Sequence, residues 1–226
     1  MDYYRTLHNE MITVIRKIAS ALFSFPKTIY VNLRYLPLSQ AVKLPVWCHW
    51  NTSFTGNGKL VVDKPHTAVI RLGSSSHRFP SQRFALCLTG VLRFKGAASI
   101  GTGCKMLVEG NLTIGENFAC SGGGIIDCKS ESTFGDNVLV GHQCNFIDCD
   151  GHSIMRAGVV INEKAGYHIG NHVWLGRECL ILKGTRICDN VIFGARSTIS
   201  GNYEIQNAVY VGAPAKIIKE GVTWMH

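Results

Sequence analysis

One histidine in this sequence combines the residue type and the neighbours that proton transfer requires. His152 follows an Asp-Gly pair at 150–151, and Asp148 lies two positions before that pair. Asp-Gly favours a turn, and a neutral imidazole exposed there could accept a proton from a hydroxyl or an amine. A neighbouring carboxylate could hold the ring in the required tautomer. The alternative is a turn histidine that only hydrogen-bonds its own loop, and the spacing leaves both interpretations open.

The nine cysteines are the second group of reactive side chains. No Cys-x-x-Cys pair occurs, so the sequence does not indicate a zinc site, and we expect no metal. Cys104, Cys120, Cys144 and Cys179 fall in phase with the repeat described next, which predicts small buried hydrophobic residues. A thiol-rich chain in which residues 1–25 do not fit a signal peptide favours the cytoplasm.

A six-residue repeat determines where these side chains can lie. An apolar residue returns at every sixth position, and a mostly small residue follows four places after each. This period is typical of a β-solenoid, in which both positions point inward and the chain turns between short strands. The apolar series is Ile169, Leu175, Ile181, Ile187, Phe193, Ile199, Ile205, Val211 and Ile217.

The same repeat extends towards the N-terminus with short interruptions. If three hexads make one coil, each coil takes eighteen residues, and two-residue insertions bulge out at corners. Ile70 lies three hexads before Leu88, so the repeat is expected there, interrupted by a loop at 74–80. The predicted inward residues are Leu88, Phe94, Ile100, Met106 and Leu112, then Ile114, Cys120 and Ile126, then Phe134, Val140 and Phe146.

The repeat has one large break, between Phe146 and Ile169. If the six-residue phase continued, Asp150 and His152 would point into the core, where an unpaired carboxylate is costly. The chain is therefore expected to leave the coil near Cys149, so that His152 lies at the mouth of an excursion loop over 150–167. Long loops in a compact repeat are usually functional.

The chain divides into three predicted segments. Residues 1–45 form an N-terminal helix and an irregular lead-in, residues 46–218 form the solenoid domain, and 219–226 form a C-terminal tail. The helix is expected over 3–24, with Pro26 ending it. Its apolar stripe fits either a membrane surface or packing on the body or a neighbouring subunit. Strands are expected at 46–50 and 60–63, and the two terminal segments are expected to cap the solenoid.

Composition narrows the partners. The chain has 226 residues, 46% of them hydrophobic and 17% charged, which provides a core and suits an oligomer with part of its surface covered. The formal net charge of +8 favours polyanionic partners such as phosphorylated cofactors, anionic glycans or a membrane surface. The positive residues are scattered, so a nucleic-acid groove is not expected.

The motifs taken together resemble those of a known family. The hexads, the Asp-Gly-His turn, IGNHVWLG at 169–176 and VYVGAPAKIIK at 209–219 resemble the hexapeptide-repeat acyltransferases, in the branch of galactoside, maltose and polysaccharide O-acetyltransferases. The resemblance covers roughly residues 90–220. It implies an all-β fold, a left-handed parallel β-helix, assembled as a homotrimer with active sites between subunits.

The resemblance also implies roles for individual residues. His152 would deprotonate the acceptor hydroxyl, whose oxygen attacks the thioester of acetyl-CoA directly. Asp127 matches an acceptor-binding aspartate, with Asp148 and Asp150 as further orienting carboxylates, but the family's asparagine has no match near 121–122. Arg177 stands where relatives often have a small polar residue. The implied cofactor-binding residues are Trp174 and Gly176 with Arg177, Gly194 and Ala195 along the cofactor arm, Ser200 near the adenine, and Lys216 and Lys219 at the phosphates.

Four functions follow, in order of preference. The first is an O-acetyltransferase acting on a sugar hydroxyl of a capsule, O-antigen or other surface glycan, in the cytoplasm and at the inner face of the membrane if the helix binds lipid. The second is a sugar-amine N-acetyltransferase or a serine acetyltransferase. The third is a metal-dependent hydratase of the γ-carbonic-anhydrase kind, with His142, His168 and His172 as the available ligands. The fourth is a solenoid without catalysis.

Overall fold

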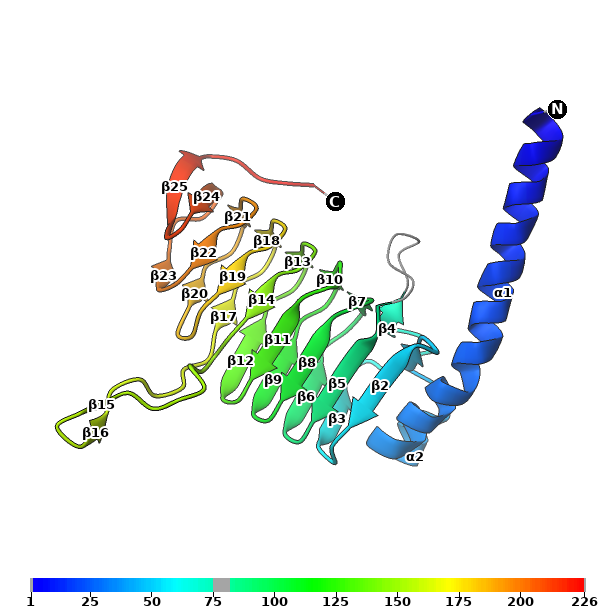
Figure 1. The fold of residues 1–226 in the computed structure, drawn as a ribbon, viewed down its shortest axis with the longest axis horizontal. Coiled ribbons are helices and arrows are strands. Elements are labelled where there is room, and N and C mark those ends of the chain that lie inside the picture. Colours follow the sequence, from blue (N-terminus) through cyan, green and yellow to red (C-terminus); the bar gives the residue numbers. More distant parts are fainter. Residues whose placement is uncertain (1, 75–81, 226) are drawn as a thin grey trace.

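A computed structural model describes residues 2–74 and 82–225 of the chain, so most of the loop expected at 74–80 lies outside the described residues. Helix α1 (Asp2–Tyr35) and the short helix α2 (Leu38–Ala41) precede a solenoid of short strands, and helix α1 lies across one end of it (Figure 1). A two-stranded hairpin, β15 (Met155–Arg156) with β16 (Val159–Val160), projects from the solenoid near its middle.

The described strands of the solenoid form three sheets, which we call sheets A, B and C and which are parallel except where β25 joins sheet A. Sheet A contains β1 (Val46–Cys48), β4 (Ile70–Ser74), β7 (Ala98–Gly101), β10 (Phe118–Cys120), β13 (Leu139–Val140), β18 (Trp174–Leu175), β21 (Val191–Phe193), β24 (Ala208–Gly212) and β25 (Ala215–Glu220). Sheet B contains β2 (Thr52–Thr55), β5 (Phe84–Leu88), β8 (Lys105–Val108), β11 (Ile125–Cys128), β14 (Asn145–Phe146), β19 (Leu180–Ile181) and β22 (Thr198–Ile199). Sheet C contains β3 (Lys59–Val62), β6 (Val91–Phe94), β9 (Asn111–Ile114), β12 (Glu131–Phe134), β17 (His168–Ile169), β20 (Arg186–Ile187) and β23 (Asn202–Tyr203).

The predicted inward positions are confirmed over most of the solenoid. All the residues predicted to point inward between Leu88 and Phe146 are buried, and so are the hexad residues from Ile169 to Ile199. Side chains alternate across a strand, so the residues between them face outward. Large rings fill the middle of the core, where Phe134 lies 5.0 Å from Phe118 and 4.9 Å from Phe146 between ring centroids.

The expectation of eighteen residues per coil holds only for the C-terminal part. There Trp174 pairs with Ile192, eighteen positions later. In the middle coils Lys105 pairs with Ile125 and Ile125 with Asn145, which is twenty residues per coil. The two extra residues lie at the corner where the chain passes from sheet B to sheet C. Gly110 is needed at this corner, because a Cβ there would overlap the carbonyl oxygen of Ser130 in the next coil.

The expected phase is wrong at both ends. Ile205 is 46% exposed, because the chain leaves the six-residue phase after Tyr203 and places Ala208 and Tyr210 in the core instead. The chain then reverses at Gly212, and β25 pairs antiparallel with β24. At the other end Ile70 pairs with Val46 in sheet A, so it is out of phase with Leu88, a residue of sheet B. Strand β2 also separates β1 from β3, where only a turn was expected.

The prediction that Pro26 ends the first helix is wrong. Helix α1 continues to Tyr35, because its second half docks on the first coil and replaces a neighbouring strand there. The Asn32 side chain accepts from the Val46 N–H at 3.1 Å and donates to the Val46 carbonyl at 2.7 Å. Thr28 Oγ1 accepts from the Cys48 N–H at 3.0 Å. These bonds satisfy the open edge of β1 and offset the helix hydrogen bond that proline cannot make.

The described apolar stripe of the helix does not pack on the body of the chain, which removes one of its expected roles. Met11, Ile15, Ile18 and Leu22 are each more than half exposed. Within the described residues, neither helix combines the length and apolar character needed to cross a membrane.

Candidate active site

The excursion predicted at 150–167 is present and leaves the solenoid from the corner between sheets B and C. We call residues 150–166 the arm. It follows β14 and replaces the two extra residues that the preceding coil carries at this corner, and the chain re-enters the core at Tyr167. In Figure 1 the arm extends away from the body. Its described residues from 150 to 161 are all exposed, and His152 is among them, outside the core.

Three side chains hold the base of the arm. The Lys183 ammonium lies 2.6 Å from Asp150 Oδ2 and also donates to the carbonyl oxygens of Asn162 and Glu163. The Asn162 side-chain amide donates to Asp150 Oδ2 and to the His152 carbonyl, both at 2.8 Å. The Lys183 ammonium, with help from Asn162, lowers the pKa of Asp150 below its ordinary value. Asp150 therefore orients the segment that carries His152.

Replacing Lys183 by methionine is expected to loosen the arm. At pH 7 the amides of residues 150–166 should exchange with deuterium several-fold faster than in the unaltered protein, as measured by mass spectrometry. Because the folded pKa of Asp150 is lowered, its contribution is present above the ordinary aspartate value of about 3.9 and is lost as the pH falls through the lower folded value. The unaltered protein should therefore loosen only in that acidic range. Lys105→Met, on the exposed face of β8, is the control, and equal exchange in both variants would contradict this role.

Asp148 is not exposed to an acceptor, so any orienting role would act through its contacts inside the solenoid. Its side chain is fully buried at the corner between sheets B and C. The N–H groups of Lys129 and Ser130 and the hydroxyl of Ser130 each donate to Asp148 Oδ2 at 2.7 Å. Because these groups belong to the preceding coil, Asp148 links two coils at the place where the arm departs.

Asp127 has one carboxylate oxygen that the described part of the chain leaves unpaired. It lies on the outward side of β11 in sheet B, and its Oδ1 is buried without a hydrogen-bond partner among the described residues. Burial is the main cause that raises the pKa of this carboxyl, and the nearby Asp148 and Glu109 add to the increase while Lys129 opposes it. An unpaired buried acceptor of this kind is costly unless another molecule donates to it.

The expected cofactor residues fall into two groups and one isolated residue. Gly176 and Arg177 lie at the corner between sheets A and B. Gly194 and Ala195 lie at the same corner one coil later, so the two pairs contact each other. A Cβ on Gly176 would lie 2.6 Å from the Ala195 nitrogen, so this corner requires glycine. Ser200 stands apart at the corner between sheets B and C, where its N–H donates to the Tyr203 hydroxyl.

The second group is a row on the outer face of sheet A. Trp174 pairs with Ile192, Ile192 with Val209, and Val209 with Lys219, so the four residues share one register position. With strands roughly 4.8 Å apart, the row extends about 14 Å along the solenoid. Trp174 is 39% exposed, and Lys219 and Lys216 are exposed on β25.

An aromatic contact that the repeat did not predict lies beside this row. The C-terminal tail turns back along sheet A and places Trp224 on the ring of His172, with centroids 4.4 Å apart and the planes nearly parallel. The Trp224 indole N–H donates to the His172 carbonyl at 3.0 Å, and its ring lies 6.1 Å from that of Trp174. The signal in the sequence was a large aromatic residue, Trp224, in a tail that was expected only to cap the solenoid.

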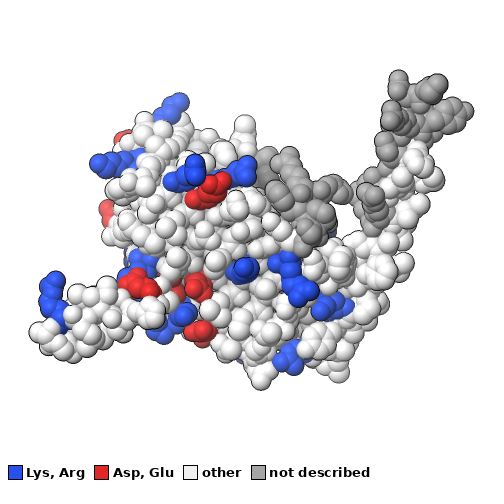
Figure 2. Space-filling view, in the orientation of Figure 1, with Lys and Arg blue, Asp and Glu red and all other residues white. Residues whose placement is uncertain are grey.

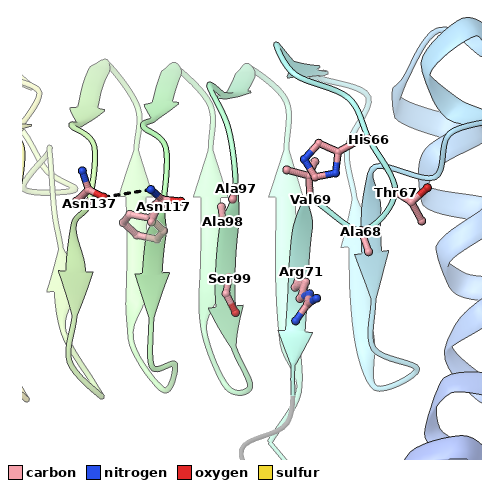
Figure 3. A pocket seen from close by; sticks show the side chains of 11 residues that line it. His66, Thr67, Ala68, Val69, Arg71, Ala97, Ala98, Ser99, Asn117 and Asn137 are labelled. Carbon is pink, nitrogen blue, oxygen red and sulfur yellow. Dashed lines mark hydrogen bonds between the residues drawn. The ribbon is translucent and has the colours of Figure 1, made fainter. Parts of the chain in front are cut away.

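Trp224 and His172 line one end of a long groove on sheet A. A pocket of about 300 Å³ lies between them and Leu139, Asn117 and Asn137. Asn117 and Asn137 also line a second pocket of about 610 Å³, which continues towards the N-terminal coils (Figure 3). The Asn117 amide donates to Asn137 Oδ1 at 3.1 Å. The twenty-residue spacing of these asparagines, one per coil, was the signal for this polar edge.

The three histidines of the hydratase hypothesis do not converge within one chain. His168 lies on sheet C, 3.1 Å from Thr133 Oγ1, and burial is the main cause that lowers its pKa. His172 lies 2.8 Å from Asn190 Oδ1 at the corner between sheets C and A. His142 follows β13 at the corner between sheets A and B. Over residues 2–74 and 82–225, no group of three or more His, Cys, Asp or Glu is placed to hold a metal ion.

Comparison with known proteins gives three findings. A family model described as "Bacterial transferase hexapeptide (six repeats)" matches residues 166–201. The polysialic acid O-acetyltransferase of Neisseria meningitidis is 28% identical over 197 residues, which cover 86% of this chain and 84% of that protein. The galactoside O-acetyltransferase of Escherichia coli K12 is 31% identical over 112 residues, 49% of this chain and 54% of that protein.

Among solved structures, the polySia-specific acetyltransferase NeuO is similar in fold, with a TM-score of 0.51 and 21% identity over 78% of this chain and 85% of that one. The three-sheet coil is thus a left-handed parallel β-helix. The repeat, the fold and these similarities confirm the resemblance to the hexapeptide-repeat acyltransferases. The two relatives named above act on a polysaccharide and on a galactoside.

Proposed function

We propose that this protein transfers the acetyl group of acetyl-CoA to a hydroxyl of a glycan, with His152 as general base. The observation that carries the proposal is the exposed imidazole on an arm that leaves an acetyltransferase fold at the one long break in its repeat. The relatives named above, a polysialic acid and a galactoside O-acetyltransferase, support a sugar acceptor.

The chemistry needs one proton carrier and no covalent enzyme intermediate. His152 takes the proton of the acceptor hydroxyl while the hydroxyl oxygen attacks the thioester carbonyl. The tetrahedral intermediate then collapses, the C–S bond breaks, and the CoA thiolate recovers the proton from the imidazolium. A backbone N–H or another donor beside the carbonyl would stabilise the developing oxyanion. None of the nine cysteines is needed as a nucleophile.

A homotrimer would bring the arm to the rest of the site. Outward positions of sheets A and B include Ala119, Leu139 and Ile192, and Leu107, Ile125 and Leu180, whereas sheet C presents mostly polar and charged residues. Three copies arranged around the corner between sheets A and B would pack sheet A of one copy against sheet B of the next. The arm of one copy, which leaves the far edge of sheet B, would then lie beside sheet A of its neighbour.

The exposed residues of the arm support this arrangement. Ile154, Met155, Val159 and Ile161 are each at least half exposed. A single chain offers them no cover, and apolar patches of this kind usually mark an interface. The site would be composite, with His152 from one copy and the sheet A groove from the next.

The row on sheet A is our candidate binding site for the pantetheine chain of the cofactor. Trp174 gives it a partly exposed ring at one end, and Lys219, with Lys216 nearby, gives it cations at the other. An extended pantetheine chain along Ile192 and Val209 would reach from the apolar end to the phosphates, where an ammonium group binds as a point charge.

The groove that ends at Trp224 and His172 is our candidate binding site for the acceptor. Its floor at Leu139 and its indole wall suit the apolar face of a sugar ring. The amides of Asn117 and Asn137 suit hydroxyl groups. Asp127, on sheet B of the opposing copy, would accept from a further hydroxyl. Since acetyl-CoA is made in the cytoplasm and all nine thiols are free, we place the reaction there.

The function is tested by acetyl-CoA turnover with two acceptors, a galactoside and polysialic acid. We expect CoA release to depend on an acceptor and the product to be an ester, which mild alkali cleaves. An alkali-stable amide formed on an amino sugar or on serine would support the second hypothesis instead. Binding of acetyl-CoA should also raise the Tm, by a shift that grows with ligand concentration. Absence of both the shift and turnover would leave only the solenoid without catalysis.

A further inference from the structure

We propose that helix α1 and the N-terminal end of the solenoid form a docking surface for an anionic membrane. This surface is separate from the site described above. Eight residues of the helix share one side, at spacings of three and four, and all are exposed. This exposed apolar stripe consists of Met11, Val14, Ile15, Ile18, Leu22, Phe25, Ile29 and Leu33.

The stripe lies on a different face from the one that docks on the solenoid. The docking face consists of buried residues, among them Ser24, Thr28, Val31 and Tyr35. With 100° between successive residues, the centre of the stripe lies roughly 120° around the helix from the centre of that face. Leu33 is 56% exposed although the helix is docked at this point. The stripe therefore has no partner within this chain along the described length of the helix.

Further apolar side chains extend this surface. Leu38 and Val42, in and after helix α2, are 69% and 68% exposed at the same end of the molecule. Helix α1 is 34 residues long, or roughly 50 Å, and in Figure 1 it extends well beyond the width of the coil. A long, narrow and apolar surface of this kind suits a planar interface better than a pocket on a globular partner.

The positive charge of this region favours anionic lipid over a second copy of the chain as the partner of the docking surface. Residues 11–62 contain six Lys and Arg and no Asp or Glu. In Figure 2 the end that carries helix α1 shows Lys and Arg, while the visible Asp and Glu lie towards the C-terminal half of the solenoid. Two copies of this region packed together would bring like charges face to face. Anionic lipid headgroups would instead attract each cation near the surface.

The helix should therefore lie in the interface plane with the exposed apolar stripe among the acyl chains. Since no described helix can span a bilayer, the contact is peripheral and reversible. The arm leaves the solenoid many strands away from helix α1, so the site would face away from the lipid surface (Figure 1).

Co-sedimentation with vesicles of phosphatidylcholine containing phosphatidylglycerol tests this proposal with the full-length protein. We expect binding that weakens when the phosphatidylglycerol is omitted and when salt is raised. The double substitution Ile18→Glu and Leu22→Glu should lower binding roughly 100-fold, because two aliphatic side chains no longer enter the interface. The control, Asn111→Glu and Asn202→Glu on the exposed face of sheet C, adds the same charge and should bind nearly as well as the unaltered protein.

Two further measurements make the result decisive. Light scattering after gel filtration reports the oligomeric state, and acetyl transfer to a soluble acceptor reports the site. The proposal is overturned if the unaltered protein does not bind the vesicles, if the stripe and control variants bind equally, or if the stripe variant breaks up the oligomer. That last outcome would make a second copy the occupant. If the unaltered protein shows no acetyl transfer but binds the vesicles, the proposed function is wrong and the membrane proposal stands.

Discussion

Replacing His152 by alanine is expected to lower kcat for acetyl transfer by about 10²–10⁴-fold, the contribution of a positioned general base. The KM for acetyl-CoA should change little, because the imidazole acts on the acceptor hydroxyl. The substitution should not disturb the fold, since His152 is exposed on the arm and its loss leaves no cavity in the core. Steady-state kinetics with saturating acetyl-CoA and a glycan acceptor would measure the effect.

A control on the same arm separates chemistry from local structure. Ser153, the next residue, is also exposed, and Ser153→Ala should keep nearly the full rate. The Asn162 amide contacts the backbone carbonyl of His152 and not its ring, so this anchor of the arm is retained in both variants. If His152→Ala keeps the rate of Ser153→Ala, the assignment of the base is wrong.

Mixing two inactive variants is expected to restore activity, because we propose that each site takes residues from two copies. One variant carries His152→Ala, and the other carries Trp174→Ala with Lys219→Ala on sheet A. In randomly mixed trimers half of the arms and half of the sheet A surfaces are intact, so about a quarter of the composite sites should work. Each variant alone should be nearly inactive at low acetyl-CoA concentration.

The mixed sample must be formed by co-expression or by unfolding and refolding, so that subunits exchange. A chain that carries all three substitutions, mixed with the His152→Ala variant, is the matched control and should recover nothing, because every arm in it lacks the base. If the first mixture also stays inactive while its subunits have exchanged, the base and the cofactor residues belong to one copy. That result would refute the composite site without refuting the acetyltransferase.

The hexads were sufficient to predict the burial of most of the core, from Leu88 to Ile199, because a short period relates each side chain to its neighbours along the chain. The position of the arm was predictable for the same reason, since a carboxylate and an imidazole could not continue in the inward phase. The hexads predict the wrong coil length in the middle of the chain. Two residues added at a corner change the register with the next coil but leave the hexads of each sheet intact.

Individual site residues were harder to predict. Asp148 and Asp150 are two positions apart, yet Asp148 is buried in bonds to the preceding coil and Asp150 holds the arm through Lys183. The chain leaves the solenoid between these two carboxylates. A shift of that point by one residue would change which of them is buried, and the sequence does not fix it so closely. The helix likewise continues past Pro26 because the edge of β1 needs partners, and local propensity does not contain that information.

The sequence by itself determined the solenoid, the position of its one long break and the exposure of His152, because these follow from side-chain polarity at fixed spacing along the chain. Only the tertiary structure decided which distant segments meet. Trp224 stacks on His172, Lys183 pairs with Asp150, and Thr28 and Asn32 complete the edge of β1. Such contacts depend on the number of residues in each coil and on the paths of the two terminal segments, which no local period specifies.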